Sequence, residues 1–495
     1  MMERQIRQLA VALGALFVVL LGQVTYIQVV AAERLADNDA NAKRQLIAEY
    51  EVNRGQILAA DGRTILASSK RSTGELRFER RYALGSLYAH LTGYYSFVYG
   101  RSELEKWFNE YLAGEAPQLL PQTLTDMVLG RPRRGASIVT SIVPALQEVA
   151  AEALGDLPGA VAAIDPRTGN VLALVANPSY DPNPLSSHDP AQIRDTWEAL
   201  NADPDKPMLS RASDELYPPG STFKIVVAAA ALANGMGPAS LWPNPHELDL
   251  PDTTETLSNF GGATCSGGSQ ITLADALRQS CNVVFGEIGL ELGPEALAEQ
   301  AWAFGFAPTS STGDVPFDIP FQEGVFPDPS YFEDRRPAAA LSAIGQDNVA
   351  ANPLQMALVA GAIGNGGIMM RPRLVTEVRG PDGQIVETFE PEVLSQPMTE
   401  VNAALLAAMM IDVVDSGTGR AAAIPGVSVA GKTGTAQHGE GLAPHAWFVS
   451  FAPAEDPQIA VAVIVLDGGS LGSDATGGAL AAPIAKAVME AALGR

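Results

Sequence analysis

The sequence has little of what nucleic-acid-binding, metal-binding and redox proteins depend on. It contains two cysteines and five histidines, and Lys+Arg number 32 against 56 Asp+Glu, which gives a net charge of −24. A chain with this charge is repelled by a phosphate backbone, so we expect no nucleic-acid partner. The histidines show no ligand spacing and the cysteines form no cluster, so we expect no metal ion and no cofactor.

Long hydrophobic runs are equally scarce, and the one present lies near the N-terminus. Residues 9–30 carry no charge, and a helix of this length would measure about 33 Å, enough to cross a bilayer core. Arg4 and Arg7 precede the run, so the positive-inside tendency predicts a cytoplasmic tail at residues 1–8, a transmembrane anchor at 9–30 and export of everything after it. The alternative is a cleaved signal peptide, because the end of the run resembles a small-residue cleavage site.

Length and pattern predict two exported domains. Residues 31–136 would form the smaller one, with two short strands around the Asp-Gly turn at 61–62, a strand and loop at 90–96 and an amphipathic helix at 103–112. The apolar face of that helix would consist of Leu104, Trp107, Phe108 and Leu112. Residues 137–495 would form the larger domain.

The larger domain shows mixed helix and strand patterns. We expect helices at 143–154 and 481–493, a hairpin of strands 160–164 and 171–175, and a second pair of strands at 447–452 and 459–466. Two further segments, 238–268 and 308–336, are rich in Pro, Gly, Asp and Ser, and we interpret them as long surface loops.

Three short motifs in the larger domain carry chemistry, and Ser221-Thr-Phe-Lys224 is the first. It follows Tyr217-Pro-Pro-Gly and opens an apolar run to residue 232, so the serine and the lysine would share one face at a helix start. A lysine desolvated there can take the proton of Ser221, and the helix start can stabilise an oxyanion. Alone, a serine and a lysine three positions apart are more often incidental.

Ser280-Cys-Asn282 is the second motif. A capping pattern at Thr272 predicts a short helix that runs into the motif, which would therefore lie on a loop. Ser280 could relay a proton between Lys224 and a leaving amine, and the Asn282 amide could hold the lysine and a substrate carbonyl. A serine or asparagine after a helix is by itself a common turn residue.

The third motif is Lys432-Thr-Gly434, preceded by a strand pattern at 427–430 and followed by Thr435. Its glycine lets a substrate approach the backbone closely, and an edge strand can pair with an extended peptide. Lys432, Thr433 and Thr435 would bind a terminal carboxylate, and the Thr435 N–H could complete an oxyanion hole.

Gly426-Val-Ser-Val-Ala-Gly-Lys-Thr433 also satisfies a phosphate-loop pattern. Such a loop must join a strand to a helix, whereas the residues inside this one are strand-like and Gly434 follows it. Nucleotide binding is therefore disfavoured.

The two cysteines, Cys265 and Cys281, belong to the part of the chain that we expect to be exported, where disulfides persist. A bridge between them would tether the loop that carries Ser280 and Asn282. The alternative is a pair of small buried apolar side chains that never bond.

Together and in this order, the three motifs resemble those of serine β-lactamases and penicillin-binding proteins. Other segments extend the resemblance, over nearly the whole chain, to class B penicillin-binding proteins, the monofunctional transpeptidases of bacterial cell-wall synthesis. These segments are Arg54-Gly-Gln-Ile-Leu58, Asp61-Gly-Arg-Thr-Ile-Leu-Ala67, Ala163-Ile-Asp-Pro-Arg-Thr-Gly169, Asn177-Pro-Ser-Tyr-Asp-Pro-Asn183, Ser342-Ala-Ile-Gly-Gln346 and Gly417-Thr-Gly419. Within the class, residues 90–96 and the pairing of Cys265 with Ser280-Cys-Asn282 look most like the penicillin-binding protein A group of high-GC Gram-positive bacteria.

The resemblance implies an α/β (α+β) fold of the serine β-lactamase and penicillin-binding transpeptidase type, with a central antiparallel sheet flanked by helices, a smaller N-terminal pedestal or dimerisation-like domain and one transmembrane helix. It implies that Ser221 attacks a peptidoglycan stem peptide at its penultimate D-Ala, that an amine of a neighbouring stem completes the cross-link, and that β-lactams acylate the same serine. Expected partners are the stem peptides of the lipid-linked precursor, the membrane, a separate glycan polymerase and division or elongation proteins.

Other functions of the same fold are kept as alternatives. A D,D-carboxypeptidase would use water as the acceptor at the same site. A β-lactam sensor or a division scaffold would bind without catalysis, although a sensor has several membrane spans and a scaffold is expected to have lost a motif. Chain length and the lack of a Glu-x-x-Leu-Asn motif after Ser280 disfavour a class A β-lactamase.

Overall fold

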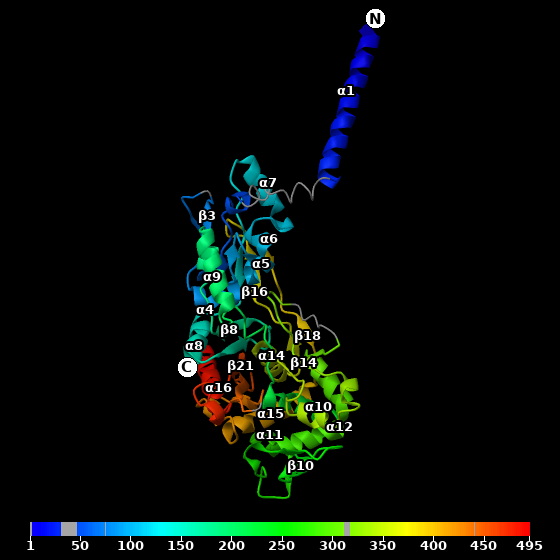
Figure 1. The fold of residues 1–495 in the computed structure, drawn as a ribbon, viewed down its shortest axis with the longest axis vertical. Coiled ribbons are helices and arrows are strands. Elements are labelled where there is room, and N and C mark those ends of the chain that lie inside the picture. The colour runs from blue at the N-terminus through cyan, green and yellow to red at the C-terminus, as the bar shows by residue number, and fades with distance from the viewer. Residues whose placement is uncertain (1, 31–46, 75, 311–316, 440) are drawn as a thin grey trace.

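The computed structural model describes every residue except 1, 31–46, 75, 311–316 and 440 (Figure 1). The molecule is elongated along one axis. A projecting N-terminal helix lies at one end, a smaller domain that we call the pedestal follows, and a larger domain occupies the other end.

The N-terminal helix α1 (Met2–Thr25) is followed by a π-helical turn at Tyr26–Val30. The stretch Arg4–Val29 is long and apolar enough to cross a membrane, and its side chains are exposed throughout. The predicted apolar helix is therefore present. It starts before residue 9 because the polar residues that precede the apolar run continue the helix.

The pedestal is built on a six-stranded sheet in the order β17-β16-β6-β1-β2-β3. Strands β1 and β6 pair in parallel, and the other neighbours are antiparallel. The strands are β1 (Ile57–Leu58), β2 (Ile65–Arg71), β3 (Phe78–Tyr82), β6 (Ser137–Thr140), β16 (Val375–Arg379) and β17 (Ile385–Thr388). The sheet thus combines strands from both sides of residue 136, including a hairpin from far downstream in the chain.

The prediction of a strand and loop at 90–96 is wrong for its first half. Residues 90–92 end helix α4 (Gly85–Thr92), on which Tyr88 and Leu91, three positions apart, are buried. The helix ends at Gly93, whose positive φ of 68° reverses the chain into the short strand β4 (Tyr95–Ser96), which pairs with β5 (Gly100–Arg101).

The helix predicted at 103–112 is interrupted. Phe108 has non-helical torsion angles and separates α5 (Glu103–Trp107) from α6 (Asn109–Leu112). Leu104, Phe108 and Leu112 are buried as predicted, but Trp107 is 57% exposed, with the Lys106 ammonium 5.3 Å from the centre of its ring. The break turns Trp107 away from the apolar face. The 3-10 turn Pro117–Leu119 and helix α7 (Leu120–Val128) complete the pedestal.

The larger domain is built on a five-stranded antiparallel sheet in the order β19-β20-β21-β7-β8. Its strands are β7 (Gly159–Ile164), β8 (Val171–Asn177), β19 (Ala430–Ala436), β20 (His445–Ala452) and β21 (Ile459–Val465). Alternate residues of β7 divide between two cores: Ala160, Ala162 and Ile164 pack in one, and Val161 and Ala163 in the other. The predicted central antiparallel sheet and both predicted strand pairs are confirmed.

Helices cover both faces of this sheet, as predicted. Helices α8 (Pro144–Leu154) and α16 (Ala481–Ala492) pack on one face and α14 (Pro353–Gly364) on the other. The remaining helices are α9 (Pro190–Ala202), α10 (Lys224–Ala233), α11 (Leu273–Gln279), α12 (Asn282–Ala303), α13 (Arg336–Ser342) and α15 (Glu400–Asp415).

The segments expected to be loops contain short strands. In and next to 238–268, β9 (Leu241–Pro243) pairs with β12 (Gln270–Thr272), and β10 (Glu247–Asp249) pairs with β11 (Thr256–Ser258). Segment 308–336 lies partly outside the described residues, and its strand β14 (Val325–Phe326) pairs with β13 (Ala307–Pro308). A further pair joins β15 (Met369–Met370) to β18 (Val393–Ser395).

Candidate active site

The three motifs meet where the start of α10, the turn between α11 and α12, and strand β19 come together. A 3-10 turn at Gly220–Phe223 leads into α10 and packs on β19. The turn and the strand lie close together: a Cβ on Gly434 would lie 2.9 Å from Thr222 Cγ2 and 3.0 Å from the carbonyl oxygen of Pro219. The absence of a side chain at Gly434 therefore lets Ser221 lie beside the third motif.

Lys224 is fully buried in the first turn of α10, and Ser221 is half-buried in the turn before it. The Lys224 ammonium donates to Asn282 Oδ1 at 2.7 Å and to the carbonyl oxygen of Ser280 at 2.8 Å. Burial lowers the pKa of Lys224 well below its usual value, and the nearby charge of Lys432 lowers it further. A lysine that loses its proton this readily is suited to activate a serine hydroxyl.

Ser280 lies at a sharp turn between two helices. It ends α11 with a left-handed φ of 61°, and Asn282 already begins α12. The Ser280 hydroxyl accepts from Lys432 Nζ at 2.8 Å and lies 3.5 Å from Lys224 Nζ. One hydroxyl therefore connects the two lysines, which is a suitable geometry for passing a proton between the first and third motifs.

Strand β19 carries the third motif along an edge of the sheet. It begins at Ala430 and continues through the motif to Ala436, whereas the sequence pattern placed the strand at 427–430. Because β19 is an edge strand, its outer backbone groups can pair with an extended peptide. The same geometry rules out the phosphate loop, since β19 pairs with β20 along its whole length and turns into it.

Lys432 is also fully buried, and burial lowers its pKa to about 7. Its ammonium donates to the carbonyl oxygen of Thr433 at 2.8 Å as well as to Ser280. Thr433 is buried and Thr435 is half-buried on the same strand. A cation and two hydroxyls along one strand edge form a set that can hold a carboxylate.

Thr418 is a member of the site that the motifs did not assign. Its Oγ1 lies 2.6 Å from Thr433 Oγ1, and its backbone N–H donates to the carbonyl oxygen of Arg278 at 3.4 Å. Thr418 thus orients a hydroxyl of the third motif and contacts the helix that carries the second. In the sequence, Thr418 is marked only by its place in Gly417-Thr-Gly419. That pattern does not by itself indicate a catalytic or binding role.

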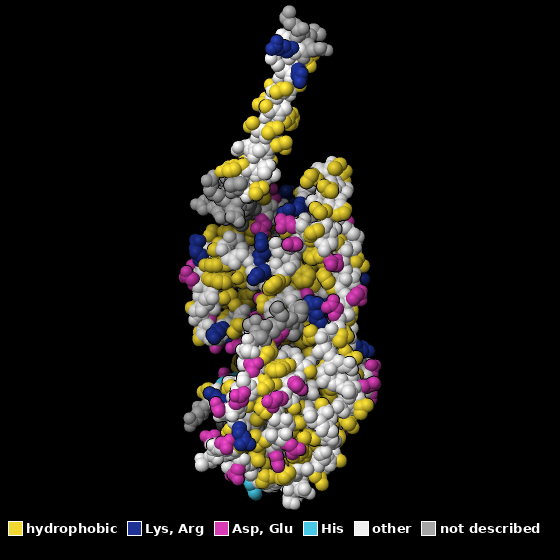
Figure 2. Space-filling view, turned by 90° about the vertical axis from the view of Figure 1, so that its right-hand side faces the viewer, with side chains coloured by type: hydrophobic (Ala, Val, Ile, Leu, Met, Phe, Trp, Pro, Cys, Tyr) yellow, Lys and Arg dark blue, Asp and Glu magenta, His cyan; other side chains and the backbone are white. Residues whose placement is uncertain are grey.

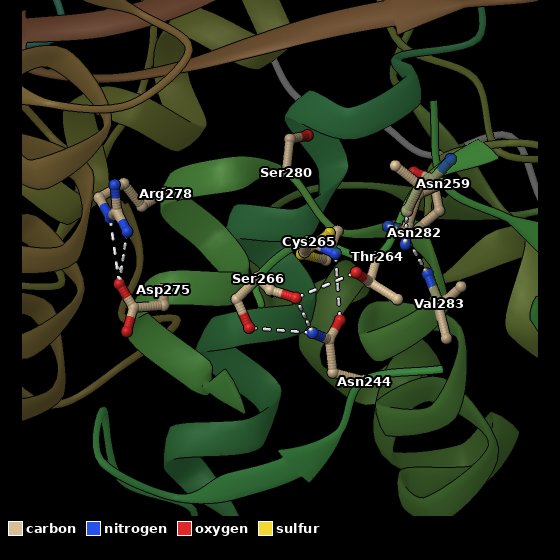
Figure 3. Close-up of a disulfide and its surroundings, with 12 residues drawn as sticks. Asn244, Asn259, Thr264, Cys265, Ser266, Asp275, Arg278, Ser280, Asn282 and Val283 are labelled. Carbon is tan, nitrogen blue, oxygen red and sulfur yellow. Dashed lines mark hydrogen bonds and ion pairs between the residues drawn. A yellow bond between two sulfur atoms is a disulfide. The ribbon is translucent and has the colours of Figure 1, made fainter. Parts of the chain in front are cut away.

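Cys265 and Cys281 are bonded to each other, with their Cα atoms 6.0 Å apart (Figure 3). In Figure 3, the Ser280 side chain points away from the sulfur atoms. The bridge therefore supports the turn from behind without occupying the space in front of the hydroxyl.

Two asparagines hold the same turn, and sequence reasoning missed both. Asn259 Oδ1 accepts from the backbone N–H groups of Asn282 and Val283 at 2.8 and 3.1 Å, so it caps the start of α12. Asn244 Oδ1 accepts from the N–H of Cys265 at 3.1 Å, and its amide donates to the carbonyl oxygens of Ser266 and Gly268. Both residues act from distant loops, so no local pattern could have identified them.

Two histidines lie just after the third motif. The rings of His438 and His445 stack with centroids 3.8 Å apart and 14° between planes, and His438 Nε2 lies 2.8 Å from Asp467 Oδ1. Ligand atoms of these three residues lie within 4.8 Å of one another. Stacked rings hold their lone pairs in two parallel planes, whereas a metal ion needs them to converge on one point, so the arrangement as it stands is an aromatic contact with a polar contact to Asp467.

Two family models match the chain. The model described as the penicillin binding protein transpeptidase domain matches residues 159–490, and that of the penicillin binding protein A dimerisation domain matches residues 54–138. Between them they cover the five-stranded sheet of the larger domain, but not α8, and the strands β1, β2 and β3 of the pedestal sheet.

Similar proteins are known by sequence and by structure. The chain is 42% identical to the peptidoglycan D,D-transpeptidase PbpA of Mycolicibacterium smegmatis and 40% identical to that of Mycobacterium tuberculosis, in each case over 99% of both chains. It superposes on penicillin-binding protein A from M. tuberculosis in its ceftriaxone acyl-enzyme complex with a TM-score of 0.85 and 40% identity, covering 90% of this chain and 100% of that one. For the penicillin G acyl-enzyme complex the TM-score is 0.83 at 39% identity, covering 89% and 100%.

Replacing both cysteines by alanine should lower the free energy of unfolding by about 3 kcal/mol, because the bridge closes a loop of about fifteen residues. Amides around residues 259–283 should also exchange hydrogen faster. Denaturant unfolding and hydrogen-exchange mass spectrometry measure the two effects. Reductant should lower the free energy of unfolding of the wild type and leave that of the double variant unchanged. Equal stability of the oxidised wild type and the double variant would contradict the prediction.

Proposed function

Since the chain belongs to the family of penicillin-binding protein transpeptidases, we propose that Ser221 is the nucleophile through which it acts. The protein is a peptidoglycan D,D-transpeptidase, and β-lactams inhibit it. The observation that carries the assignment of Ser221 is its place one helical turn before Lys224, a buried lysine whose pKa is strongly lowered.

In the acylation step, Ser221 Oγ attacks the carbonyl carbon of the penultimate D-Ala of a stem peptide. Lys224 takes the serine proton, and Asn282 holds the lysine in position through its hydrogen bond to Nζ. The backbone N–H groups of Ser221 and Thr435 stabilise the oxyanion. The bond to the terminal D-Ala then breaks, and its amine leaves with a proton delivered through Ser280.

In the second step, the ester between Ser221 and the donor stem is attacked by an amine of a neighbouring stem. The same lysine and serine take up the amine proton and return one to Ser221 Oγ, which restores the enzyme. Before acylation, Lys432, Thr433 and Thr435 hold the carboxylate of the terminal D-Ala of the donor, and a β-lactam carboxylate occupies the same place. Gly434, between the two threonines, keeps β19 close to the turn before α10, and the outer edge of β19 receives the substrate backbone.

We also propose how the chain is placed in the cell. Residues 9–30 anchor it as a single span with residues 1–8 in the cytoplasm, residues 31–136 form the pedestal, and residues 137–495 form the transpeptidase domain, whose strands β6, β16 and β17 complete the pedestal sheet. The apolar stretch Arg4–Val29 and the two arginines at its start support this arrangement. Because residues 31–136 are too short for a glycan polymerase domain, the glycan strand comes from a separate polymerase, and division or elongation proteins recruit the enzyme.

The first test is to map the adduct of a labelled penicillin on the purified protein. A stable label is expected on Ser221, with no label in Ser221→Ala and normal labelling in the control Ser330→Ala, which alters an exposed serine. Peptide mass spectrometry identifies the site. An adduct on any other residue of the wild type would falsify the assignment.

The second test is the pH dependence of acylation. Below its pKa of about 7, Lys432 is charged and attracts the carboxylate of a penicillin, and above it this attraction is lost. The second-order acylation rate should therefore fall as the pH rises through about 7, once Lys224 is neutral. A penicillin methyl ester has no carboxylate and should not show this fall, so an identical fall for acid and ester would exclude the role of Lys432.

The third test removes the hydroxyl of Thr418. Thr418→Val keeps the shape of the side chain but frees the Thr433 hydroxyl to turn away, which should lower the acylation rate about fivefold, the equivalent of one hydrogen bond. The methyl ester should be affected less than the acid. Thr253→Val at an exposed turn is the matched control. An unchanged acylation rate in Thr418→Val would show that the contact between Thr418 and Thr433 does not contribute to acylation.

A further inference from the structure

Helix α7 of the pedestal turns its apolar side outwards. Four apolar side chains of this helix are exposed, and Val128, at 88%, is the most exposed of them; the others are Leu120, Leu124 and Met127. Asp126 on the same helix is only 5% exposed. A surface helix normally has the opposite arrangement, with its apolar side against the protein, so this face is suited to an apolar environment.

Polar side chains of α7 bind the pedestal. Asp126 pairs with Arg134 at 3.5 Å and Arg131 at 3.8 Å. Gln122 donates to Asp382 and accepts from Gln384, both in the turn between β16 and β17. These contacts fix which side of α7 faces the domain. A rotation of the helix about its axis that buried the apolar side would break these contacts.

The position of α7 indicates what covers it. The helix lies at the end of the pedestal from which α1 projects (Figure 1), and hydrophobic side chains gather at this tip in Figure 2. Two arginines follow it directly: Arg131, 59% exposed and 3.8 Å from Asp126, and Arg133, 37% exposed and paired with Glu115 at 3.0 Å. An apolar helical face next to exposed arginines is the pattern of a segment that lies in the surface of an anionic bilayer.

We propose that α7 inserts its apolar face into the interface of the anionic membrane in which α1 is anchored, with Arg131 and Arg133 at the phospholipid headgroups. Four side chains are too few for a stable protein interface, which needs about 800 Å² from each partner. They suffice for a bilayer, because the anchor keeps α7 at a high effective concentration next to the lipid. The protein then has two attachments to the membrane, and the second fixes the tilt of the pedestal.

This proposal rests on the proposed membrane anchoring by α1 but not on the active site, and the test separates the two. The full chain is labelled with an environment-sensitive fluorophore at a single introduced cysteine, Leu124→Cys, since its two native cysteines are bonded to each other. Leu241→Cys, on a leucine of similar exposure in the other domain, is the matched control. Leu16→Cys in α1 reports the anchor itself.

Each protein is reconstituted into vesicles of phosphatidylcholine with phosphatidylglycerol, with or without spin-labelled lipid as a quencher. We expect the quencher to remove roughly half or more of the fluorescence at positions 16 and 124 and little at 241. Quenching at 16 but not at 124 would overturn the proposal and leave the anchor intact, and no quenching at 16 would overturn the anchor as well. If the emission at position 124 indicates an apolar environment that increases with the protein-to-lipid ratio but is not quenched by the spin-labelled lipid, a second copy of the chain covers α7 and the proposal is wrong.

A charge variant tests the headgroup contact. Arg131→Glu with Arg133→Glu should reduce the quenching at 124 at least twofold, and so should omission of phosphatidylglycerol, whereas the control Arg336→Glu in the larger domain should not. Thermal unfolding of the variants checks that the pedestal is intact. If the quenching at position 124 is the same with and without the arginine substitutions, and with and without phosphatidylglycerol, the proposed contact of Arg131 and Arg133 with the headgroups is wrong.

Discussion

The candidate active site depends on two lysines that are buried next to each other and whose acceptors, among the residues that the structure describes, are all neutral. Lys224 donates to the Asn282 amide and to the carbonyl oxygen of Ser280, and Lys432 donates to the Ser280 hydroxyl and the carbonyl oxygen of Thr433. Neutral oxygens compensate only part of the hydration that a buried ammonium loses, so the neutral form gains and the pKa of each lysine falls. A carboxylate in either place would favour the charged ammonium and raise the pKa of the lysine again.

Such a site is costly for stability, because burying ammonium groups without a counter-ion opposes folding. The surroundings must therefore be held by contacts that do not change with protonation. The disulfide between Cys265 and Cys281, the Asn259 cap on α12 and the close contact of Gly434 with the turn before α10 all meet this condition. The disulfide and the Asn259 cap act directly after Ser280 and support its left-handed conformation, which costs a serine free energy.

The sequence predicted best what depends on neighbours in the chain. The helix that follows Ser221, the hairpin of β7 and β8 and the capped start of α11 at Thr272 all have local signals, and the structure contains them. It predicted poorly what depends on distant contacts. Nothing local indicates that β16 pairs with β6, that Asn259 caps α12 or that Trp107 leaves an otherwise apolar helix face. The site residues lie in motifs because chemistry restricts them, whereas the residues that orient them are restricted only by geometry.

The pairing of β16 with β6 also decides how the pedestal and the larger domain are joined. Strands β16 and β17 leave the larger domain after α14 and complete the pedestal sheet, so the two domains share a sheet and not a flexible linker. Near the crossing, the Arg373 guanidinium donates twice to Asn170 Oδ1, at 2.8 and 2.6 Å, and the Ser141 hydroxyl donates to the carbonyl oxygen of Val171 at 2.6 Å. Asn170 and Val171 belong to the turn and strand of the β7-β8 hairpin, which lies in the same sheet as β19. Because paired strands and these hydrogen bonds join the two domains, a contact that sets the tilt of the pedestal also sets the orientation of the edge of β19.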